Sequence, residues 1–445
     1  MKDAPLKILA LSEHFLPRVG GTANYAHQTC AALAARGHDV ELLVPGPKPV
    51  SVPAIGFGRL PYKTTWLGTG YPMVGNPERS ARYAFCRAAD LEIRSRLQRE
   101  DRRPNAIHVM FGLFLMEVID THRIRSAGVP ISATVHNVPP MECARTWPGA
   151  PLTDRCYDRA RLAAVAAKNW RRIRRSPYDL YVTPSAPVAD LLKRVMWGLG
   201  RRGPIEIIPH GVNEALLSDL SPPRDRTPQG NGPLRLLTVG GWAPHKGQHL
   251  FPETLVRLRE AGRSVIWEMV GPNGRVRGYR RAVLERARAV GIEVQYGSAT
   301  ARTQCCVQRR PAVCLRVHEV LAQHNLAECY DRAHLYVQPS TEEGFCLTAL
   351  DAAAAGLPVL GSPAGALPLI APASGGRLVP SAAKPLADAI LLQASGMRSP
   401  EQKREAAERA VRIQTRFTWA RAAETLETHL REISETKACS AGLTA

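Results

Sequence analysis

The sequence predicts an α/β protein with two domains, each built around a parallel sheet. Short apolar runs alternate with helical patterns along nearly the whole chain, as they do in βαβ units. The 445 residues exceed what one hydrophobic core usually serves, so two domains are expected. Segment 220–233 is polar and rich in Pro and Gly, which indicates a linker. We therefore expect an N-terminal domain over 1–215 and a C-terminal domain over 216–416.

The apolar runs predict the individual elements. In the first domain we expect strands at 7–15, 38–45, 106–111, 130–137, 179–185 and 205–211, and a helix at 24–36. In the second domain we expect strands at 234–241, 264–271, 292–297, 334–340 and 357–362, and helices at 248–261 and 277–290. Residues 300–317 lack periodicity, and we interpret them as an insertion.

The last part of the chain predicts one more helix. Residues 417–433 are amphipathic, with Trp419, Ala423, Leu426 and Leu430 at helical spacing. The small and polar residues 434–445 that follow are expected to form a frayed tail.

Composition excludes some classes of function. The net charge of +20 fits nucleic acid, anionic lipid or acidic small molecules, but no nucleic-acid-binding motif accompanies it. The ten cysteines form no CxxC pair, and no secretion signal is evident at the start, so we expect a cytoplasmic protein with reduced thiols. Cys305, Cys306 and Cys314 cluster without a suitably spaced histidine, so no metal site is expected.

Residues 334–359 carry the strongest functional signal, because they predict a strand, a tight turn, a helix and a further strand. Glu343 lies in the turn and Asp351 in the helix, eight positions apart. The backbone N–H groups of Gly344, Phe345 and Cys346 lie between them, at or near the helix start, where unpaired donors and the helix dipole favour anions. The two carboxylates would repel a phosphate, but they can accept hydrogen bonds from hydroxyl groups. A ligand with phosphates and hydroxyls, such as a nucleotide sugar, fits both.

Three further segments strengthen this interpretation. GGWAPHKG places Lys246 and Gly247 after a predicted strand, and the glycine pair Gly20-Gly21 follows the first strand. His136 stands at the end of the predicted strand 130–137. All of these lie at carboxyl ends of strands, which is where α/β folds bind ligands.

Together these segments resemble the GT-B glycosyltransferases, and specifically the retaining family 4, over most of the chain. The resemblance implies two Rossmann-like domains facing a central cleft, with helix 417–433 packing back on the first domain. It implies catalytic roles for Glu343, His136 and Lys246. The implied donor-binding residues are Gly20, Gly21, Lys246, Glu343, Gly344, Phe345, Cys346, Leu347 and Asp351.

The roles that the resemblance implies are specific. Glu343 and His136 would hold the donor sugar, Asp351 the ribose and Lys246 the diphosphate. The resemblance also implies no metal ion and no cofactor beyond the nucleotide-diphosphate sugar, which is a co-substrate. The acceptor would be a glycan, a lipid-linked molecule or a small molecule.

Three positions depart from the family pattern. Gly241 stands where an arginine is usual, Asp351 where a glutamate is usual, and Leu369 where an acid is frequent. His245 is the nearest candidate to replace the missing cation. A degenerate member that binds nucleotide sugars without catalysis is therefore an alternative. A dehydrogenase is disfavoured, because the first βα turn lacks G-x-G-x-x-G.

Segment 155–175 predicts a basic amphipathic helix. Leu162, Val165, Ala166, Trp170 and Ile173 are expected on one face, and Arg161, Lys168, Arg172 and Arg175 on the other. Such a helix fits either a solvated domain surface or an anionic membrane. We therefore expect a cytoplasmic protein that can bind peripherally to the inner face of the membrane.

Overall fold

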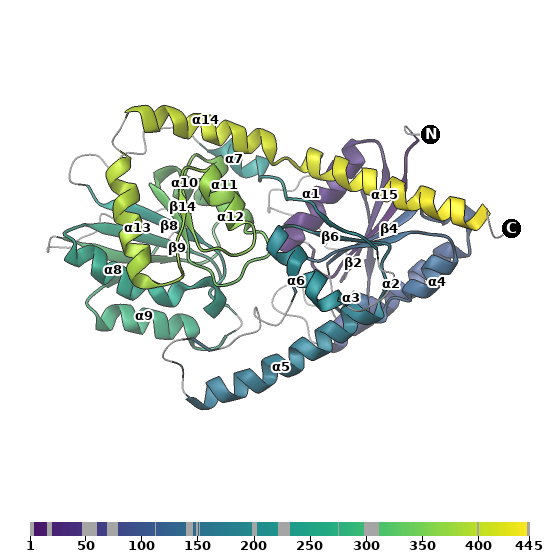
Figure 1. Cartoon of the computed structure of the whole chain (residues 1–445), viewed down its shortest axis with the longest axis horizontal. Coiled ribbons are helices and arrows are strands. Elements are labelled where there is room, and N and C mark those ends of the chain that lie inside the picture. Colours follow the sequence, from purple (N-terminus) through teal and green to yellow (C-terminus); the bar gives the residue numbers. More distant parts are fainter. Residues whose placement is uncertain are drawn as a thin grey trace. The chain divides into compact units, whose positions relative to one another are not determined.

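In the computed structural model, contacts divide the chain into two compact units. The first contains residues 1–139, 165–211 and 417–445, and the second contains 140–164 and 212–416. The structure describes residues 4–15, 20–46, 60–68, 79–111, 113–138, 146–147, 150, 152–197, 203–220, 232–274, 276–297, 311–397 and 400–442. Figure 1 labels many of the elements of both units, which are described separately below.

The first unit contains a parallel sheet of seven described strands in the order β3-β2-β1-β4-β5-β6-β7. The strands are β1 (Lys7–Ser12), β2 (Asp39–Pro45), β3 (Lys63–Leu67), β4 (Ala106–Phe111), β5 (Ile131–Thr134), β6 (Leu180–Thr183) and β7 (Ile205–Ile207). Its helices are α1 (Gly21–Ala35), α2 (Arg79–Leu97), α3 (Leu113–Val118), α4 (Thr121–Ser126), α6 (Ala186–Met196) and α15 (Trp419–Gly442), together with the end of α5 (Leu152–Arg175). The central strands are almost entirely buried, as a sheet covered by helices on both faces requires.

The second unit repeats this plan. Its described strands are parallel and follow the order β10-β11-β9-β8-β12-β13-β14. They are β8 (Leu234–Val239), β9 (Val265–Val270), β10 (Glu293–Tyr296), β11 (Val313–His318), β12 (Leu335–Gln338), β13 (Val359–Gly361) and β14 (Arg377–Leu378). The helices are α7 (Glu214–Asp219), α8 (Phe251–Glu260), α9 (Tyr279–Ala289), α10 (Gln323–Arg332), α11 (Leu347–Ala354), α12 (Leu367–Ala373), α13 (Ala383–Gly396) and α14 (Pro400–Arg416).

The predicted α/β class with parallel sheets is confirmed, and each expected strand is present. The interpretation of 300–317 as an insertion is wrong for its last part, because β11 begins at Val313 and pairs with β9 and β10. Residues 298–310 lie outside the described part. The sequence pattern did not reveal β11 because this strand carries the polar residues Arg316 and His318, which are buried beside Glu268 of β9.

The C-terminal helix extends further than predicted. The expected apolar face is confirmed, since Trp419, Ala423, Leu426 and Leu430 are all buried. Helix α15 packs along α1 in the first unit (Figure 1) and continues to Gly442, so the prediction of a frayed tail from 434 is wrong. The Lys437 ammonium holds the last turns by its bonds to Asp179 at 2.7 Å and to the Val129 carbonyl at 3.1 Å.

The structure of α5 differs from the predicted division into an apolar face and a basic face. Ala166 and Ile173 are buried as expected, but Trp170 is 41% exposed and Arg172 is buried. Arg172 turns inward because it pairs with Glu117 and donates to Asn169. Among the helices that the structure describes, none combines the length and the apolar character needed to cross a membrane.

Candidate functional site

The site in the second unit lies at the carboxyl edge of its sheet. Strands β8 and β12 are parallel neighbours, so their carboxyl ends meet at the same edge. A short 3₁₀ helix (Pro244–Lys246) follows β8 and carries Lys246, and the turn after β12 carries Glu343. The Thr341 N–H donates to the His245 carbonyl at 2.7 Å and joins the two loops.

Lys246 and Glu343 form the centre of this site. The Lys246 Nζ lies 2.7 Å from Oε1 and 2.6 Å from Oε2 of Glu343, so the ammonium bridges both carboxylate oxygens. The Glu343 side chain is buried, whereas Lys246 remains partly accessible. The structure thus brings together the residues predicted for the donor sugar and for the diphosphate.

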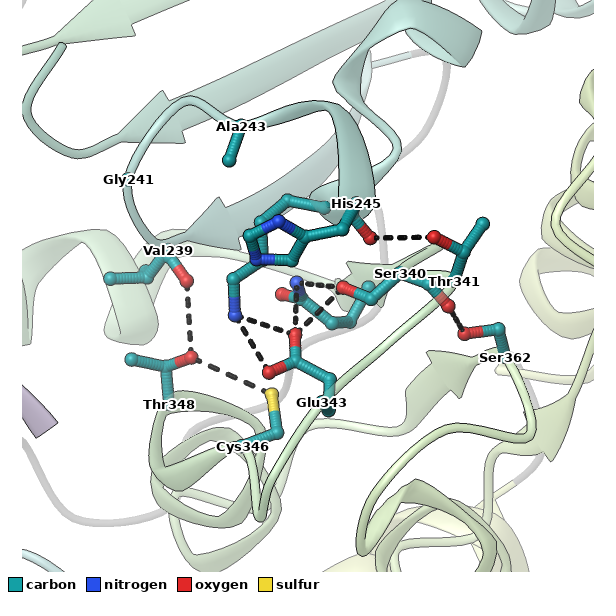
Figure 2. Close-up of polar contacts among 12 residues, drawn as sticks. Val239, Gly241, Ala243, His245, Ser340, Thr341, Glu343, Cys346, Thr348 and Ser362 are labelled. Carbon is teal, nitrogen blue, oxygen red and sulfur yellow. Dashed lines mark hydrogen bonds and ion pairs between the residues drawn. The ribbon is translucent and has the colours of Figure 1, made fainter. Parts of the chain in front are cut away.

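Two polar residues that sequence analysis missed fix the carboxylate of Glu343. The Ser340 hydroxyl donates to Oε1 at 2.7 Å, and the Gln338 amide donates to the same oxygen at 3.1 Å. Gln338 also donates to Ser340 at 2.7 Å. Figure 2 shows Ser340 beside the carboxylate of Glu343. Both residues precede Glu343 in QPSTEEGF. Their position within five residues of Glu343 was the sequence signal that could have identified them as its partners.

Two glycines make this loop arrangement feasible. Gly247 has φ +77°, and a Cβ there would lie 2.2 Å from the Pro339 carbonyl oxygen. Gly365 has φ +53°, and a Cβ there would lie 2.7 Å from the backbone oxygen of Glu343. Both positions therefore need glycine for conformation and for space. They allow the Lys246 loop and the start of α12 to approach the Glu343 turn.

The helix start predicted to bind phosphates is the beginning of α11. The helix proper starts at Leu347, and Gly344, Phe345 and Cys346 form the turn before it. Cys346 is the N-cap and has φ +81°, the only positive φ of a non-glycine residue among those that the structure describes. This left-handed conformation costs about 1–2 kcal/mol in an L-residue. Burial also raises the pKa of the Cys346 thiol to about 12, which keeps it protonated.

Asp351 lies on α11 and is buried. Its Oδ1 accepts a bond of 3.0 Å from the Asn213 backbone N–H, a contact that sequence analysis missed. Burial raises the pKa of Asp351 to about 7, although the bond from Asn213 opposes this. The predicted ribose contact stays a prediction, and the carboxylate that would make it is already bound within its own unit.

Gly241 is the position where the family pattern has arginine. The nearest atom to a Cβ added there would be the Pro272 carbonyl oxygen at 3.8 Å, an ordinary contact distance. Neither the space nor the φ at this position requires glycine. The backbone at position 241 could therefore accommodate an arginine, although the sequence has glycine there.

In the first unit, His136 and the glycine pair also follow strands at the carboxyl edge. The His136 ring Nε2 lies 3.0 Å from the Met110 carbonyl, and burial lowers the pKa of His136 to about 4, so the ring is neutral. Tyr25 and His210 pack against this ring, with centroids 4.5 and 5.3 Å away. Gly20 is the N-cap of α1 and Gly21 its first residue; a Cβ on Gly20 would meet no atom within 4 Å.

Within the described residues, one group brings potential metal ligands together. Glu268, His318 and Cys329 have ligand atoms within 4.8 Å of one another, and all three are buried. Arg332 already bonds both oxygens of Glu268, at 3.0 and 2.7 Å, and Arg316 lies nearby. Burial raises the pKa of the Cys329 thiol to about 12. A cluster with cations and a protonated thiol does not fit a divalent metal ion.

Comparison with protein-family models gives the class of protein. The model described as Glycosyltransferase Family 4 matches residues 19–216, and that described as Glycosyl transferases group 1 matches residues 233–394. The two segments together span most of the chain. No curated protein matches the chain in sequence. The fold and these matches define a glycosyltransferase.

Solved structures share the whole architecture. Sucrose-phosphate synthase from Thermosynechococcus elongatus aligns over 96% of this chain and 99% of its own, with 20% identity and a TM-score of 0.70. An α,α-trehalose-phosphate synthase (UDP-forming) from Burkholderia vietnamiensis aligns over 97% and 98%, with 15% identity and a TM-score of 0.65. The catalytic domain of starch synthase IV from Arabidopsis thaliana aligns over 97% and 100%, with 13% identity and a TM-score of 0.63. The two family models place the chain among the glycosyltransferases, and these structures show that it shares the fold of GT-B members.

Proposed function

We propose that this chain is a retaining glycosyltransferase that moves a sugar from a nucleotide-diphosphate sugar to a glycan, lipid-linked or small-molecule acceptor. The Lys246–Glu343 pair carries this proposal, because it places a cation for phosphates beside an acceptor for sugar hydroxyls. Of the similar structures, the starch synthase is bound to ADP and acarbose, and the trehalose-phosphate synthase is UDP-forming. These two proteins support a nucleotide-linked donor here.

Each residue has a defined role in this proposal. Lys246 and the first-turn N–H groups of α11 would stabilise the departing diphosphate, where negative charge develops in the transition state. Glu343 would accept hydrogen bonds from the donor sugar, and Asp351 would bind the ribose. The neutral His136 would orient a sugar hydroxyl and would not transfer a proton.

The reaction itself requires no covalent enzyme intermediate. The bond between the anomeric carbon and the diphosphate oxygen breaks, while the acceptor oxygen forms a new bond on the same face of the sugar. The acceptor proton passes to an oxygen of the departing diphosphate. This scheme uses no metal ion and no cofactor besides the donor itself.

A non-catalytic nucleotide-sugar-binding protein is the second candidate. Gly241 removes one expected cation, and Asp351 is bonded to the backbone of Asn213. Both features weaken the diphosphate and ribose contacts without removing the Lys246–Glu343 pair. This candidate predicts binding of the donor without transfer.

The protein is proposed to act in the cytoplasm, in peripheral contact with an anionic membrane through 155–175. Helix α5 exposes Lys168, Trp170 and Arg171 along its last turns. An aromatic ring among cations suits the interface of an anionic bilayer.

A thermal-shift screen followed by product analysis tests the proposal. One of the UDP-, GDP-, ADP- or dTDP-sugars should stabilise the chain, by about 2.7 kcal/mol at a hundredfold excess over Kd. The product should keep the anomeric configuration of the donor, as read by proton NMR. Glu343→Gln should lower kcat/KM about a hundredfold, while Glu342→Gln in the same turn serves as the control.

Three results would count against this function. Absence of stabilisation by every nucleotide sugar would remove the donor assignment. Stabilisation without transfer to any acceptor would select the non-catalytic candidate. An inverted product would retain the transferase and reject the retaining mechanism.

A further inference from the structure

A group of cations surrounds Tyr83 in the first unit, and none of these residues has a role in the reaction proposed above. The Arg79 guanidinium lies over the Tyr83 ring, 5.5 Å from its centroid, and its Nη2 lies 3.5 Å from the phenolic oxygen. Arg172 of α5 donates to the same oxygen at 3.2 Å. The Tyr83 hydroxyl in turn donates to Glu117 at 2.5 Å. One phenol thus orders two guanidinium groups from two helices.

Lys168 adds a third cation to this group. It lies one helical turn before Arg172 on α5. Partial desolvation, together with the charges of Arg172 and Arg79, lowers the pKa of Lys168. Lys168 therefore lies on the same side of α5 as Arg172.

The negative charge nearby does not balance these cations. Glu117 is paired with Arg172. Within the ranges that the structure describes, neither Arg79 nor Lys168 lies within salt-bridge distance of a carboxylate, and both side chains are exposed. Three cations and one carboxylate leave this exposed group with a net positive charge. The arrangement therefore fits a ligand with negative charge.

The group lies at the functional edge of the sheet. Arg82 follows Arg79 by one turn on α2 and binds the buried carboxylate of Glu13 at 3.0 Å. Glu13 comes directly after β1 and also accepts the Leu115 N–H at 3.0 Å. These bonds fix the first turn of α2 at the carboxyl end of β1. Ligands of α/β folds bind at this edge, and the positive end of the α2 dipole adds to the attraction.

We propose that Arg79, Lys168 and Tyr83 form a binding site for a phosphate group carried by the acceptor. This inference rests on the proposed function and names the acceptor class, a phosphate-bearing molecule. A guanidinium fork and an ammonium point charge together match the several oxygens of a phosphate. The phosphate belongs either to a lipid headgroup or to a soluble phosphorylated acceptor.

Binding of simple phosphate probes tests this site without knowledge of the acceptor. Calorimetric titration with inorganic phosphate, at an ionic strength matched with chloride, tests the soluble source. Flotation with phosphatidylcholine vesicles, with and without phosphatidic acid, tests the lipid source. The double variant Arg79→Ala/Lys168→Ala should weaken binding about tenfold or more. Arg87→Ala, an exposed arginine on the same helix α2, should leave binding unchanged.

The outcomes separate the sources. Variant-sensitive binding of inorganic phosphate supports a soluble phosphorylated acceptor, and variant-sensitive flotation only with phosphatidic acid supports a lipid headgroup. Equal binding by the wild type and the double variant, or no binding of either probe, overturns the site. Stabilisation by nucleotide sugars is measured in parallel, because it depends on the second unit. Its failure would refute the donor assignment and leave the phosphate result intact.

Discussion

At the scale of single residues, the pairing of Glu343 decides what the site can bind. Its carboxylate receives bonds from Lys246, Ser340 and Gln338, so its buried charge is well compensated. A sugar hydroxyl can join this network only as a further donor or by displacing one of the three. Lys246 is the most accessible of them and can turn toward a diphosphate while remaining close to Glu343. The pair thus couples recognition of the sugar to recognition of the phosphates.

Gly241→Arg should raise activity, because it restores the cation that the family pattern places in this loop. A Cβ at this position meets its nearest atom at 3.8 Å, so the backbone accommodates the change. One charge stabiliser at a developing negative charge is worth about 2.7–4 kcal/mol where the site is preorganised for it. The site here has not been selected for this arginine, so we expect a gain of about tenfold in kcat/KM.

Gly241→Gln controls for side-chain length in the same assay. It offers a similar shape without the charge and should give no gain. Equal kinetics for the arginine variant and the wild type would show that His245 or another group already supplies the second positive charge.

Asp351→Asn should stabilise the chain at alkaline pH. Burial raises the pKa of Asp351 from 3.8 to about 7 in the folded state. Between these values the folded state binds more protons than the unfolded state, so stability falls as pH rises through this window. Asparagine keeps an oxygen for the Asn213 N–H and has no charge to desolvate.

Thermal melts of Asp351→Asn and the wild type across pH measure this effect. The variant should be more stable by a few kcal/mol at about pH 8, and the difference should shrink toward about pH 4. A variant that is less stable than the wild type at all pH values would show that the charged carboxylate is needed in the fold. Loss of donor affinity in the same variant would support the ribose role.

At the scale of elements, the start of α15 determines how that helix is held on the first unit. Trp419 is buried and stacks on His210, with ring centroids 5.6 Å apart and an interplanar angle of 19°. Gly211 leaves the space that the indole occupies, since a Cβ there would lie 2.7 Å from the indole Cδ1. The first turn of α15 therefore packs directly on the segment after β7.

Trp419→Ala should destabilise the first unit by about 3–5 kcal/mol, which is the cost of a large cavity in a packed site. Chemical denaturation followed by circular dichroism measures this loss. Thr425→Ala, an exposed position on the same helix, should change stability by less than about 0.5 kcal/mol. Similar effects of the two variants would show that Trp419 does not anchor α15.

The success of prediction from sequence also varied by element. Strands such as β4 and β9 are apolar except for one residue each, His108 and Glu268, so their composition is sufficient to identify them. Strand β3 was missed because it is an edge strand whose residues are half-buried or exposed. Strand β11 was missed because its polar side chains, Arg316 and His318, lie beside Glu268, a residue far away in sequence. Local pattern cannot reveal contacts of this kind.

At the scale of the whole molecule, the same limit applies to the candidate site. Glu343 and Lys246 could be named from their turns, but their direct contact joins residues 97 positions apart. The Asn213 bond to Asp351 spans 138 positions. The cationic group at Tyr83 combines α2, α3 and α5, which no single motif contains. Motifs locate the loops, and only the fold shows which loops meet.

Acid should weaken the first unit more than the second. Burial lowers the pKa of His27 and His136 to about 4 and of His108 to about 3, and it lowers the pKa of His210 well below its usual value. All four belong to the first unit. Below about pH 6.5 the unfolded state takes up protons that the folded state does not, so the stability of the first unit decreases as the pH decreases. Each histidine can contribute up to about 1.4 kcal/mol per pH unit.

The second unit responds less because its groups oppose one another. Protonation of Asp351 stabilises it as pH falls toward about 5, whereas burial lowers the pKa of His249 and acts the other way. Hydrogen exchange, corrected for its intrinsic pH dependence, measures the two units separately. Peptides covering β4 and β5 should lose protection between about pH 7 and pH 5, while peptides covering β8 and β9 change little. Equal loss in both sheets would show that the buried histidines do not control acid stability.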